Sequence, residues 1–271
     1  MIKEYNNRDD GKTIIDSSLY TPDYILDKAL DIGESILKCG GESHRIEDTV
    51  VRICSAYGAQ QTDVFALPSL IIAGIRMPDG RTASHVRRVY KTTNNMFKLD
   101  EMNAISRDVC CGAISLEEVD KKLSEINTSV PYSKIISVIG GMVAAGGFAV
   151  FFGGDLYDAV AAAIAGFFVS LMNIPKLNLV NKMLYTIAQA FVGAMCGLLL
   201  VHFGIGSNID MIMIGTIMLM IPGLAFGNAV RDLLFGDTVS GIMQLVQAVL
   251  TAVMIAFGYI VAILFFGGVI R

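Results

Sequence analysis

The chain has 271 residues, of which 54% are hydrophobic, and its mean hydropathy is positive at +0.58. Ordinary soluble domains contain fewer apolar residues, so the composition favours a membrane protein. The formal net charge is only −4. Neither half carries the basic excess that binding to phosphates requires, which argues against a nucleic-acid partner.

Charged residues are distributed unevenly along the chain. Seventeen of the 21 Lys and Arg residues and 20 of the 25 Asp and Glu residues lie at or before Lys134. The residues after Lys134 are mostly apolar and rich in Gly and Ala, as membrane-spanning segments are. We therefore predict a disordered polar leader at 1–20, an α+β domain at 21–130 and a membrane domain at 131–271.

The first half of the chain has the patterns of a small α+β domain. Apolar residues at helical spacing predict a first helix that begins near Pro22 and continues through Leu37, and the glycines at 40–41 end it. Ser43 is expected to cap a second helix. Alternating patterns predict strands, and a capping box of Ser115 and Glu118 begins the last helix. Strands are expected at 62–67, 70–76 and 82–90, with a turn at 77–80, and further helices at 99–110 and 115–126.

The second half contains apolar stretches close to the roughly 20 residues that a helix needs to cross a bilayer. They lie at about 133–152, 156–172, 183–203, 211–227 and 242–268. A soluble all-helical core is the alternative, and five such stretches in succession argue against it. The predicted fold class is a membrane all-α bundle of about five transmembrane helices, preceded by the α+β domain and surrounded by membrane lipid.

The positive charges of the connecting loops predict an orientation. Lys176 and Lys182 lie in one loop and Arg231 in another, whereas the loop with Asp155 has no basic residue. Short basic loops stay in the cytoplasm. We expect a multi-pass protein of the cell membrane with a cytoplasmic N-terminus and an outside C-terminus.

Pairs of small residues four positions apart occur within the predicted spans. They are Gly140 with Ala144, Gly141 with Ala145, and Gly193 with Gly197. Such pairs let helix backbones approach closely in lipid, so they predict a tightly packed bundle.

A dense polar motif, GGESHRIEDT, occupies residues 40–49. Its candidate functional residues are Gly41, Glu42, Ser43, Arg45, Glu47 and Thr49. His44, Glu47 and Asp48 could together bind a metal ion, or Ser43 could act as a nucleophile. The alternative is a capped helix start with favourable charges. Because the chain has no HExxH, CxxC, GxSxG or Walker motif, we expect no enzymatic activity, metal ion or cofactor.

A second polar segment, IPGLAFGNAVRDLLFGD, occupies residues 221–237. Pro222 removes a helix hydrogen bond and Gly223 loosens the next turn, so the span should be interrupted there. Transporters use such breaks as binding sites. The candidate substrate or gating residues are Pro222, Gly223, Asn228, Arg231, Asp232 and Asp237. The alternative is a kinked helix with charges at the membrane border.

A third segment, FGGDLYD, places Asp155 and Asp158 between the first two spans. Two carboxylates without a basic neighbour could exchange protons at the outer mouth of a transporter. A solvated turn with acids near a helix N-terminus is the alternative.

The segments 40–49, 152–155 and 221–237 together resemble the threonine/serine exporter family, in particular its shorter members, which are similar to the first half of the full-length exporters. The resemblance covers roughly 22–271. It implies export of threonine or serine, or alternatively of dicarboxylates, driven by the proton motive force. It also implies a partner, either a small second-half membrane subunit or a second copy. A membrane-tethered hydrolase or a sensor that uses the GGES segment is the alternative of another class.

Overall fold

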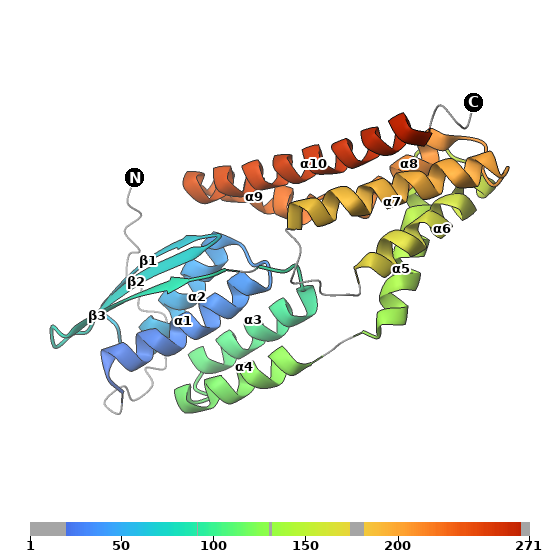
Figure 1. Ribbon diagram of the computed structural model, residues 1–271. Helices are drawn as coiled ribbons and strands as arrows, with labels where there is room; N and C mark the ends of the chain where they lie inside the picture. The colour runs from blue at the N-terminus through green and yellow to red at the C-terminus, as the bar shows by residue number, and fades with distance from the viewer. Residues whose placement is uncertain (1–19, 91, 130–131, 174–181, 267–271) are drawn as a thin grey trace. The chain divides into compact units, whose positions relative to one another are not determined.

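The computed structural model describes residues 20–90, 92–129, 132–173 and 182–266 (Figure 1). They divide into two units. The first, here called the N-terminal unit, contains the described residues up to Ser129 together with Gly227–Gln244. The second, here called the helical unit, contains the described residues between 132 and Phe226 and those from Leu245 on. Nearly all of the predicted leader lies outside the described residues.

Helices α1 (Pro22–Lys38) and α2 (Ser43–Ala56) pack together in the N-terminal unit. Thr21 caps α1 by accepting a hydrogen bond from the backbone N–H of Tyr24. The helix ends before Gly40, whose φ of +91° suits a residue without a side chain. The predicted cap of α2 is wrong, because Glu42 holds the cap position and Ser43 is the first residue of the helix. The hydroxyl of Ser43 instead bonds a distant part of the chain.

Strands β1 (Gln61–Leu67), β2 (Leu70–Arg76) and β3 (Thr82–Arg88) form an antiparallel sheet in the order β1-β2-β3. All three agree with the predicted strands to within two residues. One face of the sheet packs on α1 and α2. On the other face, Phe65 pairs with Ile72 and Ile72 with Val86, and these three side chains are exposed.

Helices α3 (Met96–Cys110) and α4 (Val119–Thr128) lie on the side of α1 and α2 that faces away from the sheet (Figure 1). A 3₁₀ helix (Leu116–Glu118) precedes α4, and the predicted capping box of Ser115 and Glu118 is present there. The unit thus has three layers around one apolar core.

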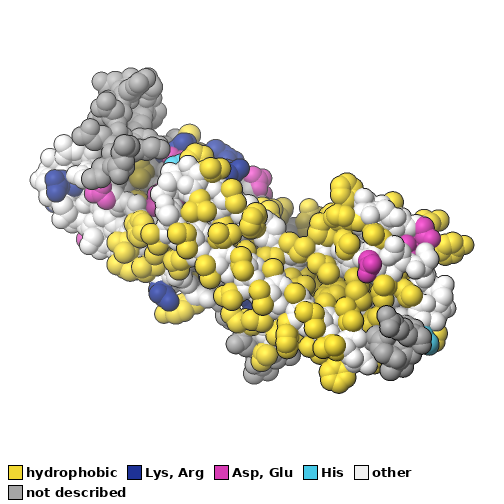
Figure 2. Space-filling model, turned by 90° about the horizontal axis from the view of Figure 1, so that it is seen from above, with side chains coloured by type: hydrophobic (Ala, Val, Ile, Leu, Met, Phe, Trp, Pro, Cys, Tyr) yellow, Lys and Arg dark blue, Asp and Glu magenta, His cyan; other side chains and the backbone are white. Residues whose placement is uncertain are grey.

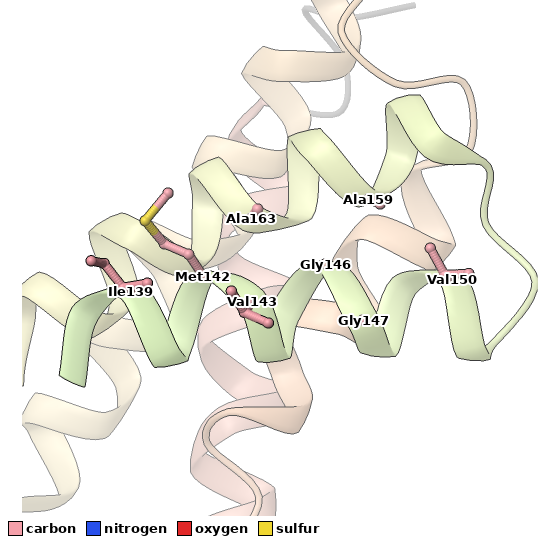
Figure 3. A pocket seen from close by; sticks show the side chains of 8 residues that line it. All are labelled: Ile139, Met142, Val143, Gly146, Gly147, Val150, Ala159 and Ala163. Carbon is pink, nitrogen blue, oxygen red and sulfur yellow. The ribbon is translucent and has the colours of Figure 1, made fainter. Parts of the chain in front are cut away.

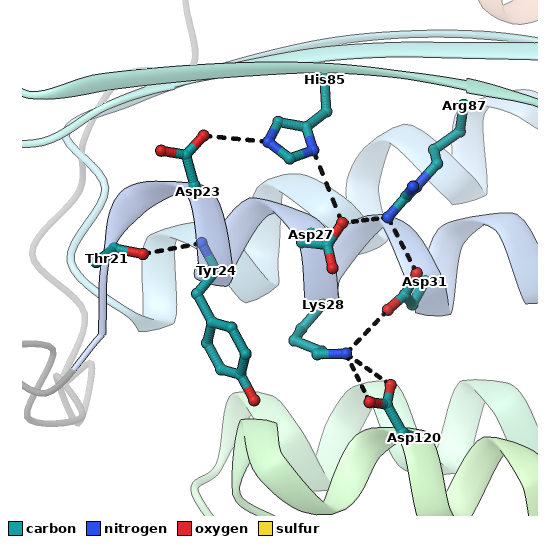
Figure 4. A network of polar contacts seen from close by, with 9 residues as sticks. All are labelled: Thr21, Asp23, Tyr24, Asp27, Lys28, Asp31, His85, Arg87 and Asp120. Carbon is teal, nitrogen blue, oxygen red and sulfur yellow. Dashed lines mark hydrogen bonds and ion pairs between the residues drawn. The ribbon is translucent and has the colours of Figure 1, made fainter.

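A polar network links α1 to its neighbours (Figure 4). The buried Lys28 lies 2.7 Å from both carboxylate oxygens of Asp120 on α4 and 3.3 Å from Asp31. Arg87 of β3 pairs with Asp27 and Asp31. These ion pairs connect the sheet to α1 and α1 to α4, and so join the three layers of the N-terminal unit.

The remaining part of the chain is helical and apolar. Its helices are α5 (Lys134–Phe151), α6 (Leu156–Met172), α7 (Lys182–His202), α8 (Ile209–Met218), α9 (Gly223–Phe235) and α10 (Thr238–Phe266). Among the described residues, α5, α7 and α10 are long and apolar enough to cross a membrane, and α8 with α9 adds a fourth candidate if the bent pair is one span. Helix α6 is apolar and 17 residues long. These helices identify a membrane helical protein, and five crossings stay a prediction.

The predicted span at 211–227 does not form one helix. Helix α8 ends at Met218, and α9 begins at Gly223 with its axis bent by 61° from that of α8. Pro222 has no N–H to donate and its ring blocks the preceding turn, so the helix breaks where the sequence predicts an interruption. The other four predicted spans each correspond to one helix.

Small residues bring the helices of the helical unit close together. A Cβ on Gly166 of α6 would lie 2.7 Å from the Cβ of Ala145 on α5, and one on Gly197 of α7 would lie 3.4 Å from Ile212. A Cβ on Gly140 would meet nothing within 4 Å. Two of the three predicted small-residue pairs therefore contribute a residue to helix contacts, whereas Gly140 faces outward.

Hydrophobic side chains cover much of the face shown in Figure 2. Exposed apolar residues follow α5, α6 and α10, as expected for helices in lipid. An apolar groove of about 500 Å³ lies between α5 and α6 (Figure 3). Its lining residues are Ile139, Met142, Val143, Gly146, Gly147, Val150, Ala159 and Ala163. The groove offers no polar side chain to a hydrophilic substrate.

Candidate functional site

Two motifs that lie far apart in the sequence meet within the N-terminal unit. The guanidinium of Arg231 on α9 forms an ion pair with Glu42 at the start of α2. The side-chain amide of Asn228 donates a hydrogen bond of 3.2 Å to the backbone carbonyl of Gly40. Neither segment alone predicts this contact. We call the region where α2, α9 and the start of α10 meet the junction; its polar residues are Glu42, Ser43, His44, Glu47, Asn228, Arg231, Asp232, Asp237, Ser240 and Gln244.

A buried hydrogen-bond network forms the interior of the junction. Ser43 and Ser240 share a hydrogen bond of 2.5 Å between their hydroxyl oxygens. Ser240 donates to Oδ2 of Asp232 at 2.9 Å, and Gln244 donates to the same oxygen at 2.7 Å. Ser43, Asp232 and Ser240 are each at most 2% exposed. The hydroxyl of Ser43 is therefore held inside the protein and is not offered to a substrate as a nucleophile.

The chain turn between α9 and α10 makes this network possible. Gly236 has a φ of +95°, a conformation that a residue without Cβ adopts easily. The backbone N–H of Asp237 then donates to the carbonyl of Asp232 at 2.9 Å. The turn brings Ser240 back beside Asp232, so the two side chains can bond.

Three side chains of types that can bind a metal ion lie together at the half-buried side of the junction. One donor atom each of His44, Glu47 and Asp237 lies within 4.8 Å of the others. The imidazole of His44 stacks on the ring of Phe235, with centroids 5.1 Å apart. Asp48, which the sequence suggested as a third ligand, instead pairs with Arg52 on the same helix.

The Glu47 carboxyl group is in an unusual electrostatic environment. Its burial raises its pKa to about 7, and the negative charges of Asp237 and Asp232 act in the same direction. The backbone N–H of Ala66 donates to Glu47 Oε1 at 2.8 Å and partly opposes this shift. Glu47 thus carries a carboxylate whose charge the surrounding protein only weakly stabilises.

The other residues of the GGES segment have separate surroundings. Gly41 lies so close to α1 that an added Cβ would be 3.0 Å from the carbonyl oxygen of Ile36. Thr49 is buried and Arg45 is exposed. Gly41 and Thr49 therefore contribute to packing, whereas Arg45 faces solvent.

Asp155 and Asp158 lie in the helical unit. They form a capping box at the start of α6, and Asp158 also accepts hydrogen bonds from the backbone N–H groups of Ser207 and Asn208 at 2.8 and 2.9 Å. Asp158 is buried and Asp155 is exposed. Pro222 and Gly223 belong to the same unit, at the break before α9.

Comparison with known proteins identifies the family. The family described as "Putative threonine/serine exporter" matches residues 27–266. The chain belongs to the threonine/serine exporter family. A "Threonine/serine exporter" from Corynebacterium glutamicum is 24% identical over 240 residues, which are 83% of this chain and 48% of that protein. The chain thus spans about half the length of this curated relative. No solved structure matches this chain significantly.

Membership of the threonine/serine exporter family and the apolar helices support a location of the protein in a membrane. Three polar contacts within its apolar helices were not predicted. Ser240 and Gln244 complete the junction, and Thr216 bonds the hydroxyl of Tyr259 at 2.6 Å inside the helical unit. Isolated polar residues within apolar stretches are the sequence signal that could have singled them out, because lipid requires them to find partners.

Proposed function

We propose that this chain is a subunit of a secondary exporter that moves threonine or serine out of the cell with the proton motive force. The observation that carries the proposal is the ion pair between Arg231 and Glu42 in a chain of an exporter family. An amino acid is a zwitterion with a carboxylate and an ammonium group. A neighbouring guanidinium and carboxylate can bind these two groups in turn.

The ion pair is accessible to such a substrate. The Arg231 side chain is 57% exposed and that of Glu42 21% exposed, so water and solutes reach both. Exchange of a surface ion pair for substrate contacts costs little, because such pairs contribute only about 0–1 kcal/mol. A dicarboxylate would find one matching charge and one repelling charge here, which makes it the less favoured substrate class.

The placement of the pair supports a cytoplasmic entrance. Arg231 shares a unit with the predicted cytoplasmic domain, so both lie on one side of the membrane in this proposal. Basic residues near spans favour the cytoplasmic side. The C-terminus of α10 is then outside. Asp155, exposed at the start of α6, is the acid that we propose to exchange protons at the outer face, with Asp158 holding the turn.

The proposal includes a partner. A second-half membrane subunit or a second copy would supply the part of the pathway that corresponds to the unmatched half of the curated relative. The junction itself requires only this chain.

The test is efflux of labelled threonine from cells that express the chain with and without a small second-half membrane subunit. Replacement of Arg231 by Ala should lower efflux at least tenfold with unchanged amounts of membrane-inserted protein. Arg52→Ala is the matched control, because Arg52 is an exposed arginine in an ion pair on α2 outside the junction. Full efflux in Arg231→Ala, or efflux of succinate but not threonine, would contradict the proposal.

A further inference from the structure

The ligand types at the half-buried side of the junction are those of transition-metal sites. His44 offers a ring nitrogen, and Glu47 and Asp237 each offer a carboxylate oxygen. One or two imidazoles with carboxylates hold Zn²⁺, Mn²⁺ or Fe²⁺ in many proteins, whereas Mg²⁺ and Ca²⁺ prefer oxygen ligands alone. One imidazole nitrogen with two carboxylate oxygens therefore favours a divalent ion of the first transition series.

The spacing of the donors fits one ion. Ligands about 2.0–2.2 Å from a metal lie about 3.3–3.6 Å apart in a tetrahedron. The three donor atoms lie within 4.8 Å of one another, so small side-chain adjustments bring them to a common ion. The stacking of His44 on Phe235 fixes the plane of the imidazole before any ion arrives.

A second observation indicates that positive charge is needed here. Asp232, close enough for its charge to act on Glu47, is fully buried, and its Oδ1 has no hydrogen-bond partner among the described residues. In the part of the chain that the structure describes, neither Glu47 nor Asp232 forms an ion pair. Buried carboxylates without a cation are costly, and a divalent ion would offset that cost.

We infer that His44, Glu47 and Asp237 form a site for a divalent transition-metal ion at the junction of α2, α9 and α10. All three side chains are half-buried, so an ion can enter from water and keep a water ligand. The ion would tie the N-terminal motif to the turn between α9 and α10. The site does not depend on which substrate the protein exports, and it departs from the sequence-based expectation of no metal ion.

The test is metal binding to the full chain purified in detergent and stripped with a chelator. We would titrate the protein with Mn²⁺, followed by the electron paramagnetic resonance signal of free Mn²⁺, and with Zn²⁺, followed by calorimetry. Mn²⁺ is included because it binds thiolates weakly, so the five cysteines do not capture it. One ion per chain is expected for each metal.

The variants His44→Ala and Asp237→Asn should each weaken binding of both ions at least tenfold. His85→Ala is the matched control, since His85 also lies near two carboxylates, Asp23 and Asp27, but outside the junction. Glu47→Gln removes the charge of the side chain and keeps its size, so it should weaken metal binding without disturbing the packing. A size-exclusion profile of each variant shows whether it is folded, which distinguishes lost binding from failed folding. Binding that persists in His44→Ala and Glu47→Gln, or that His85→Ala abolishes, would overturn the proposal.

Discussion

Ser43 of α2 and Ser240 of α10 share a buried hydrogen bond of 2.5 Å, although 197 positions separate them in the chain. Ser240 donates its single proton to Asp232, so Ser43 is the donor to Ser240. The result is a directed chain of hydroxyl groups that ends on a buried carboxylate. It connects the start of α2 to the first turn of α10.

Replacement of Ser240 by Ala should destabilise the N-terminal unit by about 1–3 kcal/mol, because it leaves the buried Ser43 hydroxyl and one bond of Asp232 unsatisfied. Thermal unfolding in detergent, followed by circular dichroism, measures the change. Ser84→Ala, at an exposed serine of β3, should change stability by less than about 0.5 kcal/mol. Equal melting temperatures for the two variants would show that the hydroxyl chain does not hold the junction together.

The ion pair of Arg231 with Glu42 permits a charge-exchange experiment. Both Glu42→Arg and Arg231→Glu should lower threonine efflux at least tenfold, because each places two like charges side by side. The double variant restores opposite charges but exchanges their positions. We expect it to remain folded and inactive, since a bound zwitterion would meet each charge in the wrong place. Recovered efflux in the double variant would mean that the pair only holds α9 against α2.

Cysteine reactivity should report the burial of the N-terminal core. Burial raises the pKa of Cys54 to about 12, so at pH 8 only about one in ten thousand of these thiols is ionised. Cys111 is exposed. Mass spectrometry after iodoacetamide treatment should find Cys111 modified at least about a thousandfold faster, with the Cys54 rate rising about tenfold per pH unit. Rapid labelling of Cys54 in the folded protein at pH 8 would contradict this packing.

The helices and strands of the N-terminal unit could be predicted because their signals are local. The positions of Gly40 and Gly80, both with positive φ, correctly marked the end of α1 and the turn before β3. Alternation of apolar residues indicated the three strands, and the capping box indicated the start of the last helix. In each case the information lies within a few residues of the feature.

The junction could not be predicted in the same way. The sequence supplied Glu42 and Arg231 as separate candidates, but 189 positions lie between them and periodicity says nothing about such distant contacts. Ser43 illustrates the cost of local reasoning. It has the residue type of a helix cap, and yet it is the first residue of α2 and its hydroxyl makes the tertiary bond to Ser240. Local spacing likewise grouped Asp48 with His44 and Glu47, whereas in the structure Asp237 lies beside these two residues and Asp48 pairs with Arg52.

The close helix packing of the helical unit gives a final prediction. A Cβ added to Gly215 of α8 would lie 2.5 Å from the carbonyl oxygen of Ala145 on α5, whereas one on Gly147 of α5 would meet nothing within 4 Å. Alanine favours a helix over glycine by roughly 1 kcal/mol at both positions. Gly147→Ala should therefore leave the melting temperature unchanged or raise it.

Gly215→Ala should instead lower stability by about 1–3 kcal/mol, because the backbone of α5 must move away from the new methyl group. The measurement is the loss of monodisperse protein on size-exclusion chromatography after heating in detergent. The two substitutions are chemically identical and both lie in apolar helices, so intrinsic helix preference cancels in the comparison. If the two variants have the same melting temperature, Gly215 of α8 does not lie as close to the backbone of Ala145 on α5 as the structure places it.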